Sequence, residues 1–412
     1  MTADSAPRRP RIGFVLAGGG ARGAYEVGVL RYILEELPRE LGRDVPVDVV
    51  CGTSVGAINA CYLAAYAEQP RLRAQLLVNS WRGLRVEQIV RVRPRELLGL
   101  VRQAMGGGAE PGEVAGGVID PGGLSKVLTD AIPFERIDDH VASGRITGVG
   151  VSTTHVGSGR TVVFVQHARY DALRWGSHPT MERRPARIRV EHALASAAIP
   201  FVFPGVRIDG ETYCDGGLRQ NVPLSPARRL GADRLVVINP HFLPTMHGDE
   251  PLEKEHEWSF ANPVYLLGKT LNALLLDRLD SDVDRLNRIN EILAAGTREY
   301  GPGFIDALNR QLGIRAGDVG LRPLETVVIR SSENIGKRCA AFVRAPAFDR
   351  RVKGLTGAAL RRMGGSGAAS EADLLSYLLF DGEFASELIA LGEADARAQR
   401  EPLLQLFEDA VR

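Results

Sequence analysis

The chain has little of what marks secreted, membrane-spanning, metal-binding or nucleic-acid-binding proteins. Its 412 residues include four cysteines, which show neither paired zinc spacing nor a disulfide framework and so indicate a reducing compartment. No run approaches the ~18 consecutive apolar residues of a membrane span. The 51 basic and 50 acidic residues nearly cancel, so the chain as a whole is no polyanion binder, and we expect no nucleic-acid partner.

The N-terminal segment resembles a signal peptide only in part. Three arginines within residues 8–11 precede the apolar run Ile12–Leu16. This run is short, however, and it leads into glycines with no cleavage site of small residues after it. We therefore interpret it as a first buried strand and expect a cytoplasmic protein.

Glycine, by contrast, is abundant, with 46 residues, and several glycines separate apolar runs. The strand Ile12–Leu16 is followed by a helical pattern over about 22–40, a strand at Pro46–Val50 and a helix at Val55–Glu68. Strands that alternate with helices predict an α/β fold with a mainly parallel sheet.

Further strands and one change of character define the expected domains. Strands are predicted at 146–152 and 161–166, which form a hairpin, at 206–214, and at 235–239. Beyond 240 the sequence becomes polar and then mostly helical, with one more strand at 324–330. We expect a disordered tail (1–10), a catalytic domain (11–240), a linker (241–262) and a mainly helical C-terminal extension (263–412).

A serine motif follows the second strand. Gly52-Thr53-Ser54-Val55-Gly56 lies between a strand and a helix, as in a nucleophile elbow, where a sharp turn lifts the serine hydroxyl out of the sheet. The N-terminus of the following helix offers N–H groups to an oxyanion. The alternative is a turn of small residues without chemistry.

A glycine-rich motif follows the first strand and allows two interpretations. Gly18-Gly19-Gly20-Ala21-Arg22-Gly23 satisfies the dinucleotide fingerprint. That site also needs an acidic residue at the tip of the second strand, whereas Asp48 lies within the strand. The other interpretation is an oxyanion hole, in which Gly19 and Gly20 present unhindered N–H groups.

A serine nucleophile needs a base, and the eight histidines offer no compelling one. His192 lies in a short helix and His155 in a predicted hairpin turn. Asp215, in contrast, comes at the end of a strand and before Gly216 and Gly217. Its carboxylate would there point into the ligand crevice that loops form beyond the carboxyl ends of the strands in an open α/β sheet. The alternative for Asp215 is an ordinary turn or capping aspartate.

Taken together, these motifs resemble the patatin-like phospholipase family. The matching segments are Gly18–Gly23, Gly52–Ala57, Ala195–Pro200, Asp215–Gly217 with Asn221-Val222-Pro223, and Leu230–Asp233. The resemblance covers about residues 12–240, and a weaker one at Ser376–Asp381 extends it into the helical extension. Ala17 and Gly217 are conservative departures from the family pattern.

The resemblance implies a three-layer α/β/α core and a Ser–Asp dyad without histidine, metal or cofactor. Ser54 would be the nucleophile and Asp215 the general base, acting on acyl esters of phospholipids or lysophospholipids through an acyl-enzyme. The implied oxyanion hole consists of Gly18, Gly19, Gly20, Arg22, Gly23 and Val55. The implied glycines of the elbow and of the base loop are Gly52, Gly56, Gly216 and Gly217.

Two rival functions and one partner remain open. The rivals are a lipid- or protein-binding module with a vestigial site and a dinucleotide-binding enzyme. The expected partner, besides the lipid, is an anionic membrane surface, because 71–103 carries a net charge of +6 and 169–189 of +4, with apolar and aromatic residues interspersed. A solvated arginine face over core helices would give the same pattern.

Overall fold

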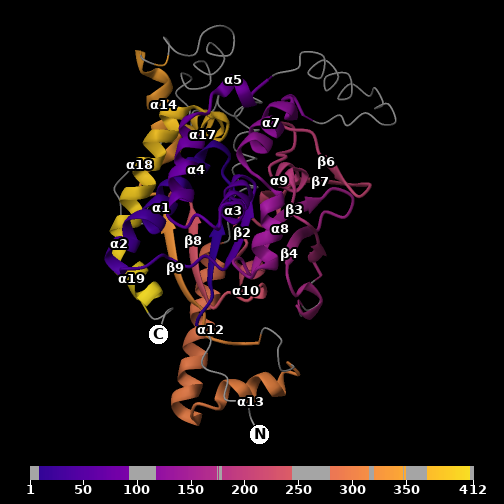
Figure 1. Ribbon diagram of the computed structural model, residues 1–412, viewed down its shortest axis with the longest axis vertical. Coiled ribbons are helices and arrows are strands. Elements are labelled where there is room, and N and C mark those ends of the chain that lie inside the picture. The colour runs from indigo at the N-terminus through magenta and orange to yellow at the C-terminus, as the bar shows by residue number, and fades with distance from the viewer. Residues whose placement is uncertain are drawn as a thin grey trace, which may run out of the picture.

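The computed structural model describes residues 9–91, 117–173, 175, 179–243, 279–314, 320–346, 348 and 369–408. Within them the chain forms one nine-stranded sheet with the order β5-β4-β3-β2-β1-β8-β9, and β7 pairs with both β3 and β6 (Figure 1). The strands are β1 (Ile12–Leu16), β2 (Val49–Thr53), β3 (Gly148–His155), β4 (Thr161–His167), β5 (Met181–Pro185), β6 (Val206–Ile208), β7 (Glu211–Asp215), β8 (Arg234–Asn239) and β9 (Glu325–Arg330).

The centre of the sheet is parallel and one side of it is antiparallel. The strands β3, β2, β1, β8 and β9 run parallel to one another, and β5 runs parallel to β4. The hairpin β3–β4 and the pairs β3–β7 and β6–β7 are antiparallel. The predicted hairpin at 146–166 is thus confirmed, and so is the mainly parallel α/β sheet. The strand segment predicted at 206–214 turns back on itself to form the second hairpin, β6–β7.

Helices cover both faces of the sheet because alternate side chains of its buried strands point to opposite faces. On β1, Phe14 and Leu16 belong to a core shared with α1 (Gly23–Arg31), α3 (Val55–Ala65) and α9 (Val190–Ser196). Val15 belongs to a second core, which includes residues of α10 (Leu224–Arg229) and α12 (Leu279–Tyr300). The result is the expected three-layer α/β/α arrangement.

The other described helices have the following bounds. They are η1 (Gly20–Arg22), η2 (Tyr32–Glu36), α2 (Leu37–Leu41), α4 (Leu72–Arg82), α5 (Val86–Ile89), α7 (Pro121–Ala131), α8 (Glu135–Ala142), η3 (Tyr170–Ala172), η4 (Gly216–Leu218), α13 (Phe304–Gln311), α14 (Ile335–Arg344), α17 (Ala369–Leu378), α18 (Gly382–Ala398) and α19 (Arg400–Glu408). In the described part of the chain, no helix is long and apolar enough to cross a membrane.

Two element boundaries differ from expectation. The second strand begins at Val49 and runs on to Thr53, because β1 on one side and β3 on the other supply backbone partners up to the serine. The high glycine content of residues 105–123 predicts a loop, yet α7 begins at Pro121 and includes Gly122 and Gly123. Asp120 caps this helix by accepting a hydrogen bond from the Gly122 N–H. Residues 105–116 lie outside the described part.

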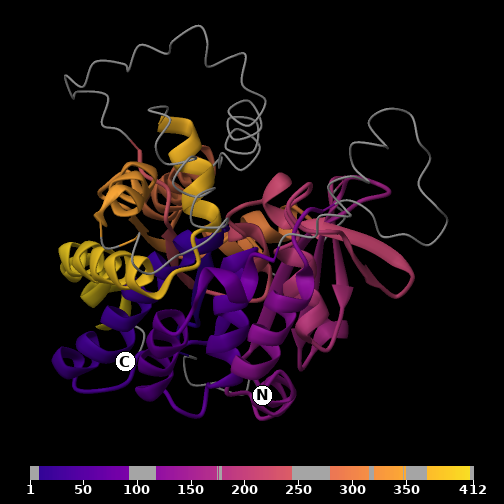
Figure 2. The same cartoon turned by 90° about the horizontal axis from the view of Figure 1, so that it is seen from above.

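The C-terminal region contacts the core closely. Strand β9 pairs in parallel with β8, so it extends the sheet formed by residues before 240. Figure 2 shows the C-terminal helices, in yellow, beside the N-terminal ones, in indigo. Most of the expected linker, 241–262, and residues 1–8 of the expected tail lie outside the described residues. The division into a catalytic domain and an extension stays a prediction.

Candidate active site

Ser54 stands on a tight turn between β2 and α3. Its backbone has φ 54° and ψ −126°, in the left-handed half of the map that costs an L-residue about 1–3 kcal/mol. The flanking glycines let the turn close. A Cβ on Gly52 would lie 2.2 Å from the Gly56 carbonyl oxygen, and one on Gly56 would lie 2.3 Å from that of Leu16. The local geometry is therefore that of a nucleophile elbow.

The sheet register brings Asp215 to Ser54. Strands β2 and β7 lie end to end along one side of β3, and β4 pairs with its other side. Thr53 pairs with Ser152 and Asp215 pairs with the next residue, Thr153, so the end of β2 meets the end of β7. The Ser54 hydroxyl donates to Asp215 Oδ2 over 2.7 Å. The other carboxylate oxygen, Oδ1, accepts the Gly217 N–H, also at 2.7 Å. Residues 161 positions apart thus form one hydrogen-bonded pair.

Burial changes the acidity of this carboxyl group. Asp215 is 1% exposed and Ser54 is 4% exposed. Desolvation raises the pKa of Asp215 from its usual 3.8 to about 7, against the opposing hydrogen bonds from Ser54 and Gly217. A carboxylate with a pKa near neutrality is a much better proton acceptor than an exposed aspartate.

Two further residues, for which the sequence analysis predicted no role, hold the pair in place. The Ser196 hydroxyl accepts the Ser54 N–H at 2.8 Å and donates to the Ser152 carbonyl at 2.6 Å. The Thr154 hydroxyl donates to the Asp215 carbonyl at 2.9 Å. Ser196 lies inside the motif Ala195–Pro200, which was the one sequence signal that could have identified it.

The glycine-rich loop lies beside the nucleophile. A Cβ on Gly18 would lie 3.2 Å from the Ser54 Cβ and 2.3 Å from Asn221 Oδ1. The Gly18 N–H already donates to the Asn221 carbonyl at 3.2 Å, and the Asn221 side-chain amide donates to the Gly18 carbonyl at 3.4 Å. Asn221 therefore anchors the start of the loop next to Ser54.

The other predicted site residues, Gly23, Arg22 and Gly216, pack against neighbouring helices or strands. Gly23 touches the first residue of α3, because a Cβ there would lie 2.4 Å from Val55 Cγ2. The Arg22 side chain is buried and contacts α17. Gly216 packs against β3, where a Cβ would lie 2.3 Å from the Ser152 carbonyl oxygen.

A buried polar chain joins the helix after the loop to the helix after the nucleophile. The Asn59 amide on α3 donates to Glu26 Oε2 on α1 at 2.8 Å. Asn59 Oδ1 in turn accepts the Trp81 indole N–H from α4 at 3.1 Å. Glu26 is fully buried, and desolvation raises its pKa well above the usual 4.5.

The histidines with described contacts have other partners. His192 Nδ1 accepts the Arg189 N–H, and its ring packs edge-on against Phe164. His140 bonds the Ala64 carbonyl, and His155 bonds Ser158. His178, His247 and His256 lie outside the described residues.

The acidic residue weighed for a dinucleotide site is engaged elsewhere. Asp48 precedes β2, pairs with Arg9 at 2.6 Å and accepts the Ile12 N–H at the start of β1. It therefore lies at the edge of the sheet opposite Ser54. Within the described ranges, no group of three or more His, Cys, Asp or Glu side chains could hold a metal ion.

A mainly apolar cavity of about 370 Å³ lies along α3. Val55, which follows Ser54, lines it together with Ile58 and Tyr62 from the same face of α3. Trp81 and Phe380 lie on other walls. The volume is within the ~300–1,000 Å³ typical of small-ligand pockets.

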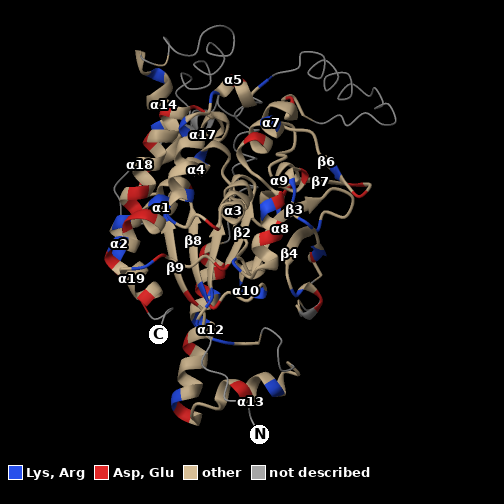
Figure 3. Ribbon diagram, in the orientation of Figure 1, with Lys and Arg blue, Asp and Glu red and all other residues tan. Residues whose placement is uncertain are grey.

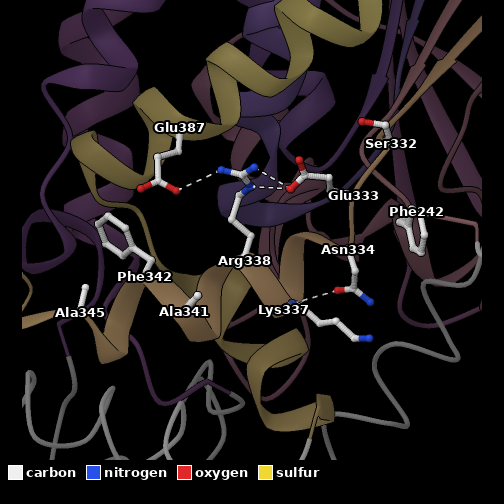
Figure 4. Close-up of a pocket in the computed structure, with 10 residues that line it drawn as sticks. All are labelled: Phe242, Ser332, Glu333, Asn334, Lys337, Arg338, Ala341, Phe342, Ala345 and Glu387. Carbon is white, nitrogen blue, oxygen red and sulfur yellow. Dashed lines mark hydrogen bonds and ion pairs between the residues drawn. The ribbon is translucent and has the colours of Figure 1, made fainter. Parts of the chain in front are cut away.

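A separate hollow of about 650 Å³ lies at the start of α14 (Figure 4). Its central cation, Arg338, pairs with Glu333 at 2.6 Å and with Glu387 at 3.4 Å. The described residues around it include no member of the dyad, the elbow or the glycine-rich loop.

The two basic segments are only partly surface features. Leu77, Trp81 and Ile89 of the first segment and Trp175 of the second are buried in the core. Some of the arginines form ion pairs: Arg71 contacts Asp44, Arg184 contacts Glu182 and Glu211, and Arg189 contacts Asp138. Figure 3 shows basic and acidic residues interspersed over the helices. Residues 92–103, with Arg93 and Arg95, lie outside the described part.

The fold and the site together define a class of protein. It has a mostly parallel α/β sheet, a serine on a strained elbow, and a buried aspartate hydrogen-bonded to that serine. Comparison with known proteins agrees. The family model for patatin-like phospholipase matches residues 14–228, just over half of the chain. The chain belongs to the patatin-like phospholipase family, as its motifs predicted.

Individual relatives match over shorter parts. The chain is 33% identical over 210 residues to a cGAMP-activated phospholipase of Pseudomonas aeruginosa, covering 50% of this chain and 53% of that protein. It is 44% identical over 57 residues to a lysophospholipase of Aspergillus terreus, 14% of this chain and 3% of that protein. The chain therefore spans about half the length of the first relative and a small part of the second.

A solved structure of human GIVD cytosolic phospholipase A2, in complex with methyl gamma-linolenyl fluorophosphonate, aligns with 97% of this chain and 59% of its own. The TM-score is 0.40 and the sequence identity is 13%.

Proposed function

We propose that the protein hydrolyses fatty-acyl esters of phospholipids or lysophospholipids through an acyl-enzyme on Ser54. The observation that carries this proposal is the 2.7 Å hydrogen bond from the Ser54 hydroxyl to a buried carboxylate whose pKa is about 7. A nucleophile on a strained turn, joined to a base of matched pKa, is the arrangement that acyl transfer requires. Membership of the patatin-like phospholipase family supports the lipid class of substrate.

In the first half-reaction, Ser54 Oγ attacks the ester carbonyl carbon while its proton passes to Asp215 Oδ2. The tetrahedral intermediate collapses as the C–O bond to the alcohol breaks and the alcohol takes that proton. In the second half, Asp215 accepts a proton from water, which attacks the acyl-enzyme carbonyl. Ser54 then recovers a proton from Asp215 as the fatty acid leaves.

The oxyanion would be held by backbone N–H groups close to Ser54. Those of Gly19 and Gly20 in the loop and of Val55 at the start of α3 are our candidates. Gly18 and Ser54 have other roles, since their N–H groups donate to the Asn221 carbonyl and to the Ser196 hydroxyl. Preorganised donors of this kind stabilise developing charge without reorganisation.

The acyl chain would occupy the apolar cavity lined by Val55, Ile58 and Tyr62. These residues lie on one face of α3 and lead away from the nucleophile over ~10 Å at 1.5 Å per residue. An acyl group attached to Ser54 could therefore follow this face while its ester carbonyl stays at the glycine-rich loop.

We place the membrane contact near the same cavity. Leu84 and Gln88 line both it and an adjacent polar hollow, around which Arg82, Arg85 and Arg91 are exposed. Basic residues at this mouth would favour anionic bilayers by ~1 kcal/mol each, and Glu87, Asp381 and Glu383 in the same hollow would reduce that gain. Liposome co-sedimentation tests it: binding should increase with anionic lipid, fall with salt, and weaken in Arg82→Gln/Arg85→Gln/Arg91→Gln.

Covalent labelling with a fluorophosphonate, which reacts only with activated serines, tests the hydrolase. We expect Ser54 to be labelled and Ser54→Ala not to be, and a chelator to have no effect on ester hydrolysis. Absence of both labelling and hydrolysis in the folded wild type would favour the vestigial binding module instead.

A further inference from the structure

The C-terminal helices contact the glycine-rich loop directly. Arg22 Nε donates to the Ser376 hydroxyl over 2.7 Å, across a separation of 354 residues. The guanidinium carbon lies 4.1 Å from the centre of the Tyr377 ring, within cation–π distance. Arg22 is 5% exposed, so these contacts replace water around a buried charge.

The backbones meet at the same place. Gly20 has φ +55°, and a Cβ there would lie 2.3 Å from the Tyr377 carbonyl oxygen. The loop therefore rests on the last turn of α17. Two adjacent residues, Ser376 and Tyr377, therefore contact the side chain of Arg22 and the main chain of Gly20.

The segment after α17 packs closely against the core through Phe380 and α18, and this restricts the position of α17. A Cβ on Gly28 of α1 would lie 1.9 Å from the Ile389 carbonyl oxygen of α18, which shows how closely the two helices pack. The Tyr25 hydroxyl of α1 donates to Asp395 Oδ2 of α18 at 2.9 Å. Between α17 and α18, Phe380 stacks on Trp81, with ring centres 6.3 Å apart.

The loop needs such external support. Three consecutive glycines have no side chains to restrict their backbone, and glycine loses the most conformational freedom on ordering. An oxyanion site works only when its donors are already oriented before the charge develops. The Arg22 side chain is long and polar, so residues outside the loop can bind it and restrict the loop.

We propose that Ser376 and Tyr377 are positioning residues for catalysis: through Arg22 and Gly20 they hold the glycine-rich loop in its oxyanion-binding conformation. The inference rests on the proposed function of that loop. It assigns the C-terminal helices a part in the chemistry, although the described hydrogen bonds of Ser54 and Asp215 involve residues of the N-terminal half of the sheet and its loops.

Steady-state hydrolysis of a short acyl ester and the rate of fluorophosphonate labelling test the proposal. Ser376→Ala and Tyr377→Leu should each lower kcat and the labelling rate by about tenfold or more, less than the ~100-fold or greater loss of an oxyanion donor, while KM changes less than about twofold. Tyr377→Phe keeps the ring and should stay within about twofold of wild type. The matched control is Ser386→Ala in α18, whose hydroxyl donates to the Gly382 carbonyl of its own helix.

A double variant distinguishes positioning from general destabilisation. If Ser376 acts through Arg22, then Ser376→Ala should cause no further loss of kcat in an Arg22→Met background. Independent, multiplicative losses would overturn the proposal, as would single variants with lowered melting temperature and unchanged kcat. If Ser376→Ala does not fold, Ser376→Cys and the two Tyr377 variants decide. Failure of the wild type to hydrolyse esters or to be labelled would refute the proposed function instead.

Discussion

Asp215→Asn should destroy activity and at the same time stabilise the protein, in a pH-dependent way. In the folded state the pKa of Asp215 is raised from 3.8 to about 7 by burial. The folded protein therefore binds more protons than the unfolded chain between these pH values, and the free energy of unfolding falls as pH rises through them. The difference is about three pKa units, and at ~1.4 kcal/mol per unit the ionisable carboxyl costs ~4 kcal/mol at pH 8.

Asparagine removes this cost because it stays neutral, and its carbonyl oxygen can still accept the Gly217 N–H. Urea unfolding of both proteins should give Asp215→Asn an advantage of ~4 kcal/mol at pH 8, about half of that near pH 5.5, and none below about pH 4. Wild-type kcat should rise with pH through about 7, because only the ionised carboxyl accepts the Ser54 proton.

Two results would refute this reasoning. A constant difference in stability between the two proteins from pH 4 to 8 would mean that Asp215 ionises normally in the folded state. Ester hydrolysis by folded Asp215→Asn at more than a few per cent of the wild-type rate would remove the aspartate as base, and the histidines would have to be tested one by one.

Other variants test the rest of the site. The free energy of unfolding of Ser54→Gly should be ~1 kcal/mol higher than that of Ser54→Ala, because only glycine adopts the φ of 54° without strain. Both variants should be inactive. Equal urea midpoints for the two would contradict a strained elbow. Gly56→Ala should lower the free energy of unfolding by more than ~2 kcal/mol, because its Cβ would lie 2.3 Å from a carbonyl oxygen. Gly303→Ala is the control: a Cβ there would have no atom within 4 Å, so the free energy of unfolding should change by less than ~0.5 kcal/mol. Glu26→Gln should remove a decline in stability above about pH 4.5 that the buried carboxyl imposes on the wild type; identical pH profiles in urea titrations would show that Glu26 is not held neutral.

The parts of the site that local sequence determines were predictable. The strand–glycine–helix pattern around Ser54 indicated the elbow because the turn, its glycines and its nucleophile are contiguous. Asp215 was a candidate from its place at a strand end, and the family resemblance implied its role as base, while its contact with Ser54 depends on the register of two strands that pair end to end with one side of β3. Register is a property of the whole sheet, so the sequence near Asp215 alone left a turn aspartate equally possible.

The supports of the site were not predictable, for different reasons. Ser196 lies inside the motif Ala195–Pro200, but this motif does not indicate that its hydroxyl accepts the Ser54 N–H. Ser376 meets Arg22 across 354 residues, and single-sequence patterns do not report such pairs. The basic segment around α4 illustrates a third reason. Helical periodicity of Leu77 and Trp81 is the same for a membrane-facing surface and for a core, and here both side chains are buried.

The place of β9 has a consequence for synthesis of the chain on the ribosome. Strand β8 ends at Asn239 and β9 begins at Glu325, so 85 residues, or several seconds of translation, separate the two partners. During that interval the side of β8 that will pair with β9 has unpaired backbone groups, a template for association with other chains. A nascent chain that carries Ser54 and Asp215 is thus open to misassembly until its C-terminal third emerges, and we expect early termination near residue 240 to yield aggregates rather than a smaller enzyme.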